Sequence, residues 1–251
     1  PAADDLAYIV FTSGSTGMPK AVITTQRMMC ANATGVCQQL PVFSDHPPII
    51  VDWMPWHHVA AGNLTFNVIL RSGGTYYLDK GRPTPKEFDI TIQNLKEIQP
   101  TFMQNVPLVY ERLAHYLEED EDFARHLFGK IDFMLYASAP MPAPVQERLD
   151  RLSSKAVGKR IPFISSLGAT ETAPACILCH WPSQAPGNLG LPMPGVEVKL
   201  VPSAEKMEMR VKGPNVTPGY LNNDLATKAA FDAEGFYCMG DAGKFVDEDQ
   251  P

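Results

Sequence analysis

A lysine closes a short run of hydroxyl-bearing residues and glycines near the start of the chain, between positions 12 and 20. The run follows Leu6 to Phe11, an apolar segment typical of a β-strand. Glycine lets the backbone approach an anion closely, successive N–H groups in such a loop form a concave anion site, and a lysine adds positive charge. The loop is therefore predicted to hold phosphate groups, and the residues concerned are Thr12, Ser13, Gly14, Ser15, Thr16, Gly17 and Lys20.

This loop differs from that of the P-loop kinases and NTPases, which carry a Gly-Lys pair followed directly by Ser or Thr. Here Pro19 precedes Lys20 and Ala21 follows it. A plain surface turn is the other interpretation, because glycine and serine are common in turns. The strand before the loop and the Pro-Lys pair at its end favour phosphate binding.

The run from Thr12 to Lys20 resembles the nucleotide loop of adenylate-forming enzymes, the superfamily of acyl-CoA synthetases, luciferases and peptide-synthetase adenylation domains. Further motifs follow in that family's order, so the resemblance covers nearly the whole chain. It implies that this loop, with Lys20 as a catalytic residue, clamps the β- and γ-phosphates of ATP. The segments 52–58 and 167–174 are most similar to feruloyl-CoA synthetase and related acid–CoA ligases.

Two adjacent histidines stand beside two tryptophans after an apolar strand, in the segment 53–58. A surface loop or a buried pair is the simpler interpretation of such residues. In the resembled family, a Pro-x-x-His segment places its histidine against the carboxylate in the acyl pocket, and His58 occupies that position here. Trp56 would then offer a flat apolar wall to an aromatic or aliphatic acid, near Ala61 and Asn63.

Small residues follow the next strong strand pattern, at Ala137, Ser138 and Ala139. Small side chains leave room for a planar ring to lie over the backbone, although a tight strand-to-helix turn fits the same residues. In the resembled family this segment usually reads Gly-Gly-Ala-Pro and borders the adenine. The resemblance therefore implies a cofactor-binding role for these three residues, with Ala137 and Ser138 in place of glycines.

The second strong motif reads Leu-Gly-Ala-Thr-Glu and resembles the family's aromatic-Gly-x-Thr-Glu motif. The resemblance implies that Thr170 donates its hydroxyl to the α-phosphate and that Glu171 holds Mg²⁺, a hard cation that prefers oxygen ligands. A helix N-cap is the alternative, because Thr and Glu are common at helix starts. Leu167, followed by Gly168 and Ala169, would cover the adenine where many members carry Tyr or Phe, without the aromatic contribution of about 0.5–1.5 kcal/mol.

The third strong motif extends from Gly219 and Tyr220 to Gly240 and Asp241. Family members read Gly-Tyr, a spacer with Thr, and then Gly-Trp-x-x-Thr-Gly-Asp, whereas this chain has Met239 where Thr is usual. The resemblance implies that Asp241 accepts hydrogen bonds from the ribose hydroxyls, a task that suits a carboxylate because it only accepts. A β-turn is the other interpretation of a Gly-Asp pair taken alone.

Together these motifs imply an AMP-forming acid–CoA ligase that uses ATP, Mg²⁺, CoA and a small-molecule carboxylic acid. The acid's carboxylate would attack the α-phosphorus of ATP to give acyl-AMP and pyrophosphate, and CoA would then displace AMP. A feruloyl, other hydroxycinnamoyl or fatty acid is the expected substrate. The alternatives are a non-catalytic module that holds ATP, AMP or an acyl-adenylate, and a P-loop kinase or NTPase, which would produce ADP instead of AMP.

Full members of the family continue past the Gly-Asp motif into an Arg-bearing hinge and a small mobile domain. That domain carries a lysine that contacts the reacting groups. The chain ends at Pro251, before either feature, and the family's region before the phosphate loop is absent too. We therefore expect the central part of a longer enzyme that binds nucleotide with little turnover, because losing one preorganised donor costs about 10²–10³ in rate.

The composition limits the classes of partner. A net charge of −7 over 251 residues argues against nucleic acid or an anionic membrane surface as a partner. The sequence shows neither an apolar run long enough for a membrane span nor a signal peptide. Five cysteines, an odd number, fit reduced thiols in the cytoplasm. Cys176, Cys179 and His180 match the haem-attachment pattern, but buried structural thiols are the expected interpretation.

Strand and helix patterns alternate through the first two-thirds of the chain, which predicts parallel βαβ units in a layered α/β sandwich. After Trp181 the sequence becomes rich in Pro and Gly and then alternates in the manner of strands, which predicts a small antiparallel β subdomain. We expect a nucleotide- and acyl-binding α/β subdomain over residues 1–185 and a β-rich subdomain over residues 186–251. Strands are expected at 6–11, 49–53, 74–78, 101–106, 132–137, 162–167, 196–201 and 206–212, and helices at 25–40, 63–70, 85–98, 107–118, 142–156 and 223–231.

Overall fold

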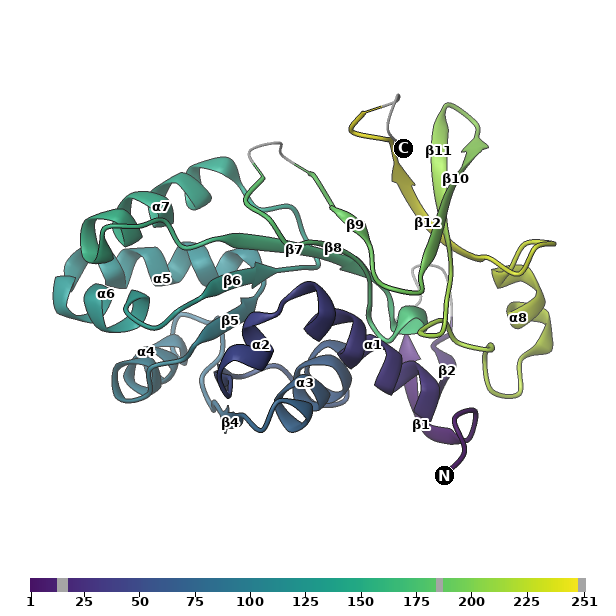
Figure 1. Ribbon diagram of the computed structural model, residues 1–251, viewed down its shortest axis with the longest axis horizontal. Coiled ribbons are helices and arrows are strands. Elements are labelled where there is room, and N and C mark those ends of the chain that lie inside the picture. Colours follow the sequence, from purple (N-terminus) through teal and green to yellow (C-terminus); the bar gives the residue numbers. More distant parts are fainter. Residues whose placement is uncertain (13–17, 184–186, 248–251) are drawn as a thin grey trace.

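A five-stranded sheet in the order β5-β6-β7-β8-β9 runs through the larger part of the protein (Figure 1). The structure, a computed structural model, describes residues 1–12, 18–183 and 187–247. Strands β5, β6 and β7 are parallel, whereas β8 and β9 each run antiparallel to the preceding strand. The strands are β5 (Phe102–Asn105), β6 (Phe133–Tyr136), β7 (Phe163–Gly168), β8 (Ala175–Cys179) and β9 (Leu191–Pro192).

Helices cover both faces of this sheet, which explains why its central strands are apolar at consecutive positions. Strand β6 shows the division: Met134 packs with the helices of one face, and Phe133 and Leu135 pack with those of the other. The first face carries α4 (Phe88–Glu97), α5 (Pro107–Glu119), α6 (Glu121–Phe128) and α7 (Ala143–Val157). The second carries α1 (Gln26–Gln39), α2 (Val42–Asp45), the π-helix η1 (Ala60–Thr65) and α3 (Phe66–Arg71).

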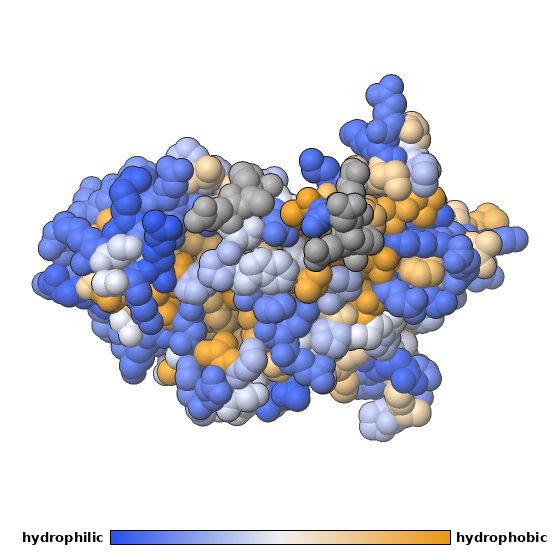
Figure 2. Space-filling view, turned by 45° about the horizontal axis from the view of Figure 1, so that its top comes forward, coloured by the Kyte–Doolittle hydropathy of each residue, from blue (hydrophilic) through white to orange (hydrophobic). Residues whose placement is uncertain are grey.

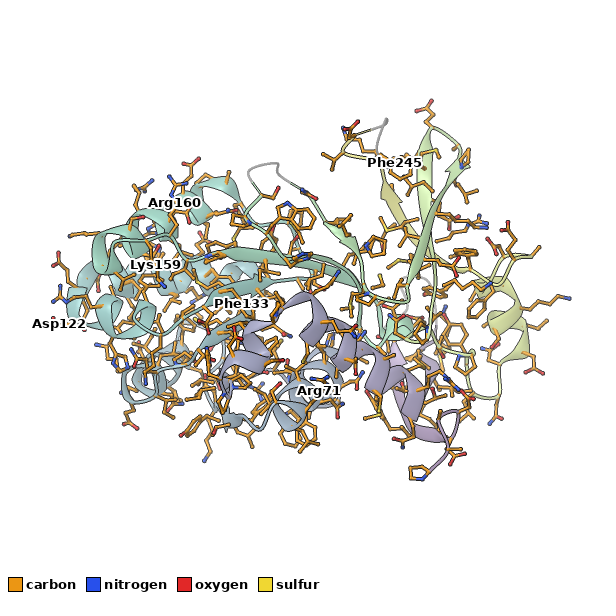
Figure 3. All side chains as sticks on the ribbon, viewed as in Figure 1. Arg71, Asp122, Phe133, Lys159, Arg160 and Phe245 are labelled. Atoms are coloured by element: carbon orange, nitrogen blue, oxygen red, sulfur yellow. The ribbon has the colours of Figure 1, made fainter. Side chains whose placement is uncertain are left out.

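Three phenylalanines pack the helices of the second face against the sheet. Phe43 of α2 meets Phe102 and Phe133 edge-on, with ring centroids 5.1 and 5.6 Å apart, and the latter two rings stack at 5.4 Å. Phe133, labelled in Figure 3, lies where β6 meets α2. Such pairs add about 0.5–1.5 kcal/mol each beyond the burial of their area, so this cluster fixes the helices that follow the phosphate loop in sequence.

Two short two-stranded sheets bring the beginning of the chain to the main sheet. Strands β1 (Leu6–Thr12) and β2 (Lys20–Thr25) form an antiparallel hairpin, and Thr25 caps α1 by accepting a hydrogen bond from the Met28 N–H at 3.3 Å. Strands β3 (Ile49–Asp52) and β4 (Thr75–Leu78) are parallel. The backbone N–H of Thr101 donates to Ile49, which places β3 beside β5.

Residues 197–243 form a separate antiparallel sheet, at the right of Figure 1, in the order β10-β11-β12. Its strands are β10 (Glu197–Ser203), β11 (Lys206–Lys212) and β12 (Tyr237–Gly243), and α8 (Asp224–Ala230) lies in the connection before β12. In Figure 2 the helical lobe at the left is mainly hydrophilic at its surface, and hydrophobic residues appear at the small sheet.

Several elements differ from the sequence-based expectations. The phosphate loop is followed by strand β2, which runs antiparallel to β1, and neither β2 nor β8 was among the expected strands. Helix α6 is not among the expected helices, and Asp120 caps it by accepting from the Phe123 N–H at 2.9 Å. Within the described ranges, no helix is both long and apolar enough to cross a bilayer.

Candidate functional site

The carboxyl ends of the parallel strands meet along one edge and carry most of the predicted site residues. In α/β sheets, ligands bind in the crevice outside these ends. Strand β3 ends at Asp52, β5 at Asn105 and β6 at Tyr136. The indole N–H of Trp53 donates to the Asn105 side-chain oxygen at 2.8 Å, which ties the loop after β3 to the end of β5.

Tyr220 brings the phosphate loop and Glu171 together. The Lys20 ammonium donates to the Tyr220 hydroxyl at 3.2 Å and lies 4.5 Å from the centre of the same ring. That hydroxyl in turn donates to Glu171 Oε1 at 2.7 Å. Both Tyr220 and Glu171 are buried, with 3% and 6% of their surfaces exposed. The lysine that ends the loop and the predicted metal ligand therefore lie within two hydrogen bonds of one another.

Part of the predicted phosphate loop can be placed. Thr12 faces Lys20 across the hairpin, and its hydroxyl oxygen is buried without a hydrogen-bond partner in the described part of the chain. Both strands of the hairpin contact the turn that carries Glu171. The remaining predicted loop residues lie outside the described residues, namely Ser13, Gly14, Ser15, Thr16 and Gly17.

A second tyrosine lies against the Glu171 carboxylate. Burial, and then the charge of Glu171, raises the pKa of Tyr237 on β12 well above its ordinary value. Burial and the hydrogen bond to the same carboxylate raise the pKa of Tyr220 in the same direction. Both phenols therefore stay protonated at physiological pH, and the Tyr220 hydroxyl donates to the buried carboxylate. The backbone of Glu171 is also held, because its carbonyl accepts from the Thr217 N–H at 2.8 Å.

The turn that presents Thr170 and Glu171 is the 3₁₀ turn η2 (Thr170–Thr172), directly after β7. A Cβ atom on Gly168 would lie 1.8 Å from the Pro174 carbonyl oxygen, so only glycine fits there. Ala169 is the N-cap residue of the turn, and its N–H donates to the Thr172 hydroxyl at 2.8 Å. The helix-cap interpretation of Thr170 is thus wrong, and Thr170 is half-buried beside Glu171.

Three buried asparagines, which the sequence analysis did not identify as a group, hold the chain just after Glu171. The side-chain amides of Asn32 and Asn215 each donate to the carbonyls of Thr172 and Ala175. Asn63 donates to the carbonyl of Ala173 at 2.5 Å. All three are 0–1% exposed and come from α1, η1 and the loop after β11. No local spacing links them, so no sequence pattern could have indicated this clamp.

The segment predicted to border a planar ring follows β6 as expected. Ser138 has a backbone φ of 71°, in the left-handed region that favours glycine. This explains in physical terms why the resembled family carries glycine in this segment. Ala137 is half-buried, and Ala139 is exposed.

Leu167 and Asp241 approach the same part of the main sheet from different elements. Leu167 on β7 packs with the hydrophobic cluster between β8 and the small sheet. Its carbonyl accepts from the Cys176 thiol at 3.4 Å. Asp241 is exposed on β12, and its charge acts on that thiol, whose pKa rises to about 12 mainly through burial. The structure therefore brings Leu167 and Asp241 to one region around Cys176.

His58 lies in the loop between β3 and η1. Its Nδ1 accepts the Ala60 N–H at 3.1 Å, and burial, followed by the charge of His57, lowers its pKa. A Cβ on Gly62 would lie 1.8 Å from the Trp56 carbonyl oxygen, so this glycine allows the loop to fold back on itself. Because Asn63 reaches Ala173, the histidine loop is anchored to the turn that carries Glu171.

The cysteines of the haem-like pattern are buried in β8, as expected for structural thiols. Residues three apart in a strand point to opposite faces, so Cys176 and Cys179 do not converge. Within the described residues, no group of three or more His, Cys, Asp or Glu side chains is arranged to hold a metal. A metal at Glu171 would therefore need other oxygen ligands, which is the usual situation of Mg²⁺ bound together with substrate phosphates.

The fold matches solved structures of adenylate-forming enzymes. The model of the family described as AMP-binding enzyme matches residues 1–221, and the chain belongs to that family. The resemblance inferred from the motifs and the predicted fold class are both confirmed.

Individual relatives are acid–CoA ligases. The chain is 28% identical to a feruloyl-CoA synthase from Amycolatopsis sp, over 95% of this chain and 47% of that protein. It is 26% identical to the mouse long-chain-fatty-acid–CoA ligase 6, over 99% of this chain and 41% of that protein. A solved malonyl-CoA ligase with methylmalonyl-CoA and AMP bound has a TM-score of 0.80 and 29% identity, over 96% and 50% of the two chains. The chain thus spans about half the length of these relatives.

Proposed function

We propose that this chain is the nucleotide-binding part of an AMP-forming acid–CoA ligase, which activates a carboxylic acid as acyl-AMP and transfers it to CoA. The observation that carries the proposal is the meeting of Lys20 and Glu171 at the Tyr220 hydroxyl. This contact supports the proposal, because a cation suited to phosphates and a carboxylate suited to a hard metal ion then lie in one small region. The family membership and the names of the relatives support the same reaction class.

The proposed roles follow the chemistry of each group. Lys20 and the hairpin loop hold the β- and γ-phosphates, and Thr170 donates to the α-phosphate. Glu171 holds Mg²⁺, which neutralises phosphate charge when bound. Asp241 accepts from the ribose hydroxyls. The adenine lies between the segments 137–139 and 167–169.

The side chains around Glu171 have the chemistry that Mg²⁺ requires of its ligands. Glu171 offers carboxylate oxygen, which Mg²⁺ prefers, and the Tyr220 hydroxyl donates to that carboxylate at 2.7 Å. Thr12 adds a buried hydroxyl that lacks a partner in the described ranges. These groups suit a nucleotide bound together with a hard cation.

The reaction needs positioning more than proton transfer. A carboxylic acid is already ionised near neutral pH, so no general base has to create the nucleophile. Charge that develops on the phosphates is best stabilised by fixed donors and cations. The buried hydrogen bonds around the turn after Gly168 supply that rigidity, and His58 in the anchored loop faces the incoming carboxylate in this proposal.

An aromatic or aliphatic acid is the proposed substrate. Trp56 is 49% exposed and packs on Phe66 and Tyr76, with centroids 5.1 and 5.7 Å away, so it presents a supported apolar surface beside His58. Hydroxycinnamic and fatty acids both match such a wall. A screen of hydroxycinnamic, benzoic and fatty acids with the full-length protein would identify the class.

Two measurements test the proposal. Isothermal titration calorimetry of the 251-residue chain with ATP and Mg²⁺ is expected to show binding. Acid-dependent exchange of pyrophosphate into ATP is expected from the full-length protein, with AMP as the nucleotide product. Binding without exchange in the full-length protein would indicate a non-catalytic module, and formation of ADP would contradict the proposal.

A further inference from the structure

We propose that Tyr220 is a positioning residue that couples Lys20 to Glu171, so that ATP and Mg²⁺ each bind more tightly when the other is present. This inference rests on the proposed nucleotide site. It concerns a residue outside the phosphate loop and outside the turn that carries the metal ligand. Tyr220 contacts both, and it reaches them from the loop before α8.

The position of Tyr220 is fixed from several sides. Its backbone N–H donates to the Thr227 hydroxyl at 2.9 Å, and it forms an isolated antiparallel bridge with Val22 of β2. Gly219, just before it, has a φ of 145°, and a Cβ there would lie 2.4 Å from the Thr227 side chain. The backbone therefore holds the phenol in one place between the hairpin and the turn after β7.

The Tyr220 hydroxyl forms a hydrogen bond with each of the two charged groups, as acceptor to one and as donor to the other. It accepts from the Lys20 ammonium and donates to the Glu171 carboxylate. Hydrogen bonds in such a chain polarise one another, so a donor that loses its own cationic partner gives a weaker hydrogen bond. When phosphates draw Lys20 away, the Glu171 carboxylate keeps more negative charge and attracts a cation more strongly. By linkage, a cation at Glu171 releases Lys20 for phosphates by the same factor.

The test compares the affinity for ATP with Mg²⁺ and with EDTA, measured by calorimetry on the 251-residue chain. The ratio of the two dissociation constants measures the coupling, whereas a merely structural loss changes both constants alike. In Tyr220→Phe the ratio is expected to fall about five- to tenfold, the range of a modest coupling between sites. Tyr8→Phe is the matched control, because the Tyr8 hydroxyl is buried in the same hairpin without a partner in the described ranges, and its ratio is expected to stay unchanged.

Two further variants keep the inference testable if Tyr220→Phe does not fold. Lys20→Met changes a half-buried residue at the start of β2, and it is expected to lower the ratio as well as the affinity for ATP. Glu171→Gln is expected to abolish the coupling. The double variant Glu171→Gln/Tyr220→Phe is expected to show the same ratio of dissociation constants as Glu171→Gln alone.

If the ratio is unchanged in Tyr220→Phe or in Lys20→Met while the wild type shows normal Mg²⁺-dependent binding, this inference is overturned and the proposed function still stands. Failure of the wild type to bind ATP under either condition would instead overturn the proposed function.

Discussion

Asn32 and Asn215 donate their side-chain amides to the same two backbone carbonyls, those of Thr172 and Ala175. The four donor–acceptor distances lie between 2.7 and 3.1 Å. Asn32 belongs to the helix after the phosphate hairpin, and Asn215 lies in the loop after β11. Two distant parts of the chain are therefore joined through the turn that presents Glu171.

Replacing either asparagine by alanine should destabilise the protein. Asn32→Ala and Asn215→Ala are each expected to lower the free energy of unfolding by about 1–3 kcal/mol, because buried carbonyls lose donors. The double variant should lose more than the sum, because each single variant leaves one amide donor on both carbonyls and only the double variant removes both donors. Urea unfolding measures these values, and Gln38→Ala on the exposed side of α1 is the control. Strictly additive losses would contradict a shared clamp.

Gly168→Ala tests the closeness of β7 to the turn after it. The added methyl group would lie 1.8 Å from the Pro174 carbonyl oxygen, so the backbone has to move. We expect a loss of about 1–3 kcal/mol in stability and a clear loss of ATP affinity, because the shift displaces Glu171. Gly35→Ala is the control, since the one atom that its Cβ would crowd is the end of the flexible Met193 side chain, at 2.6 Å. Unaltered ATP binding in Gly168→Ala would show that the nucleotide lies elsewhere.

Asp52 makes stability depend on pH between about 4 and 7. Burial raises the pKa of this carboxyl to about 6, although Tyr76 donates to it at 2.6 Å. The folded state therefore holds the proton more tightly than the unfolded state, and stability rises as the pH falls through 6. One pKa unit corresponds to about 1.4 kcal/mol, so the gain from pH 7 to pH 5 should be about 1 kcal/mol. Asp52→Asn should abolish that gain in urea unfolding, whereas the exposed control Glu205→Gln should keep it.

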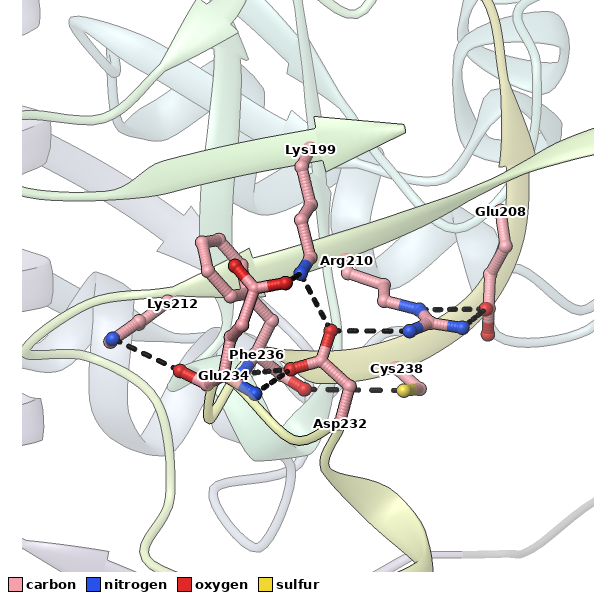
Figure 4. Close-up of polar contacts among 8 residues, drawn as sticks. All are labelled: Lys199, Glu208, Arg210, Lys212, Asp232, Glu234, Phe236 and Cys238. Atoms are coloured by element: carbon pink, nitrogen blue, oxygen red, sulfur yellow. Dashed lines mark hydrogen bonds and ion pairs between the residues drawn. The ribbon is translucent and has the colours of Figure 1, made fainter. Parts of the chain in front are cut away.

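Asp232 should give the opposite dependence at lower pH. Its carboxylate pairs with Lys199 at 2.8 Å and Arg210 at 3.1 Å and accepts the N–H groups of Glu234 and Phe236 (Figure 4). The hydrogen bond from Lys199 is the largest of the effects that hold its pKa well below the ordinary range. This contribution is present above about pH 4 and is lost as the pH falls further.

The Asp232→Asn variant tests that contribution. In thermal unfolding, the variant is expected to be less stable than the wild type at neutral pH. It is also expected to lose less stability than the wild type when the pH falls below 4. High salt should reduce the difference in melting temperature between the variant and the wild type, because these charged groups lie near the surface. A variant whose melting temperature matches the wild type at every pH would show that the ion pairs contribute nothing.

Local patterns in the sequence identified the groups that carry the proposed chemistry. Lys20 stands in a loop whose composition indicates phosphate binding, whereas the metal role of Glu171 is implied by the resemblance of its motif to that of the adenylate-forming family. The apolar periodicity likewise predicted most helices, because burying one face of a helix leaves a regular trace. The fold class followed from the alternation of such segments.

Tertiary structure decided what local patterns do not encode. The antiparallel strands β2 and β8 were not among the expected strands, because strand pairing is a property of two segments and not of one segment alone. The asparagine clamp and the position of Tyr220 depend on long-range contacts, as the bonds from Asn32 to Thr172 and from Lys20 to Tyr220 show. A residue type and its spacing determine which group is available, but only the packed chain determines which other group that residue meets.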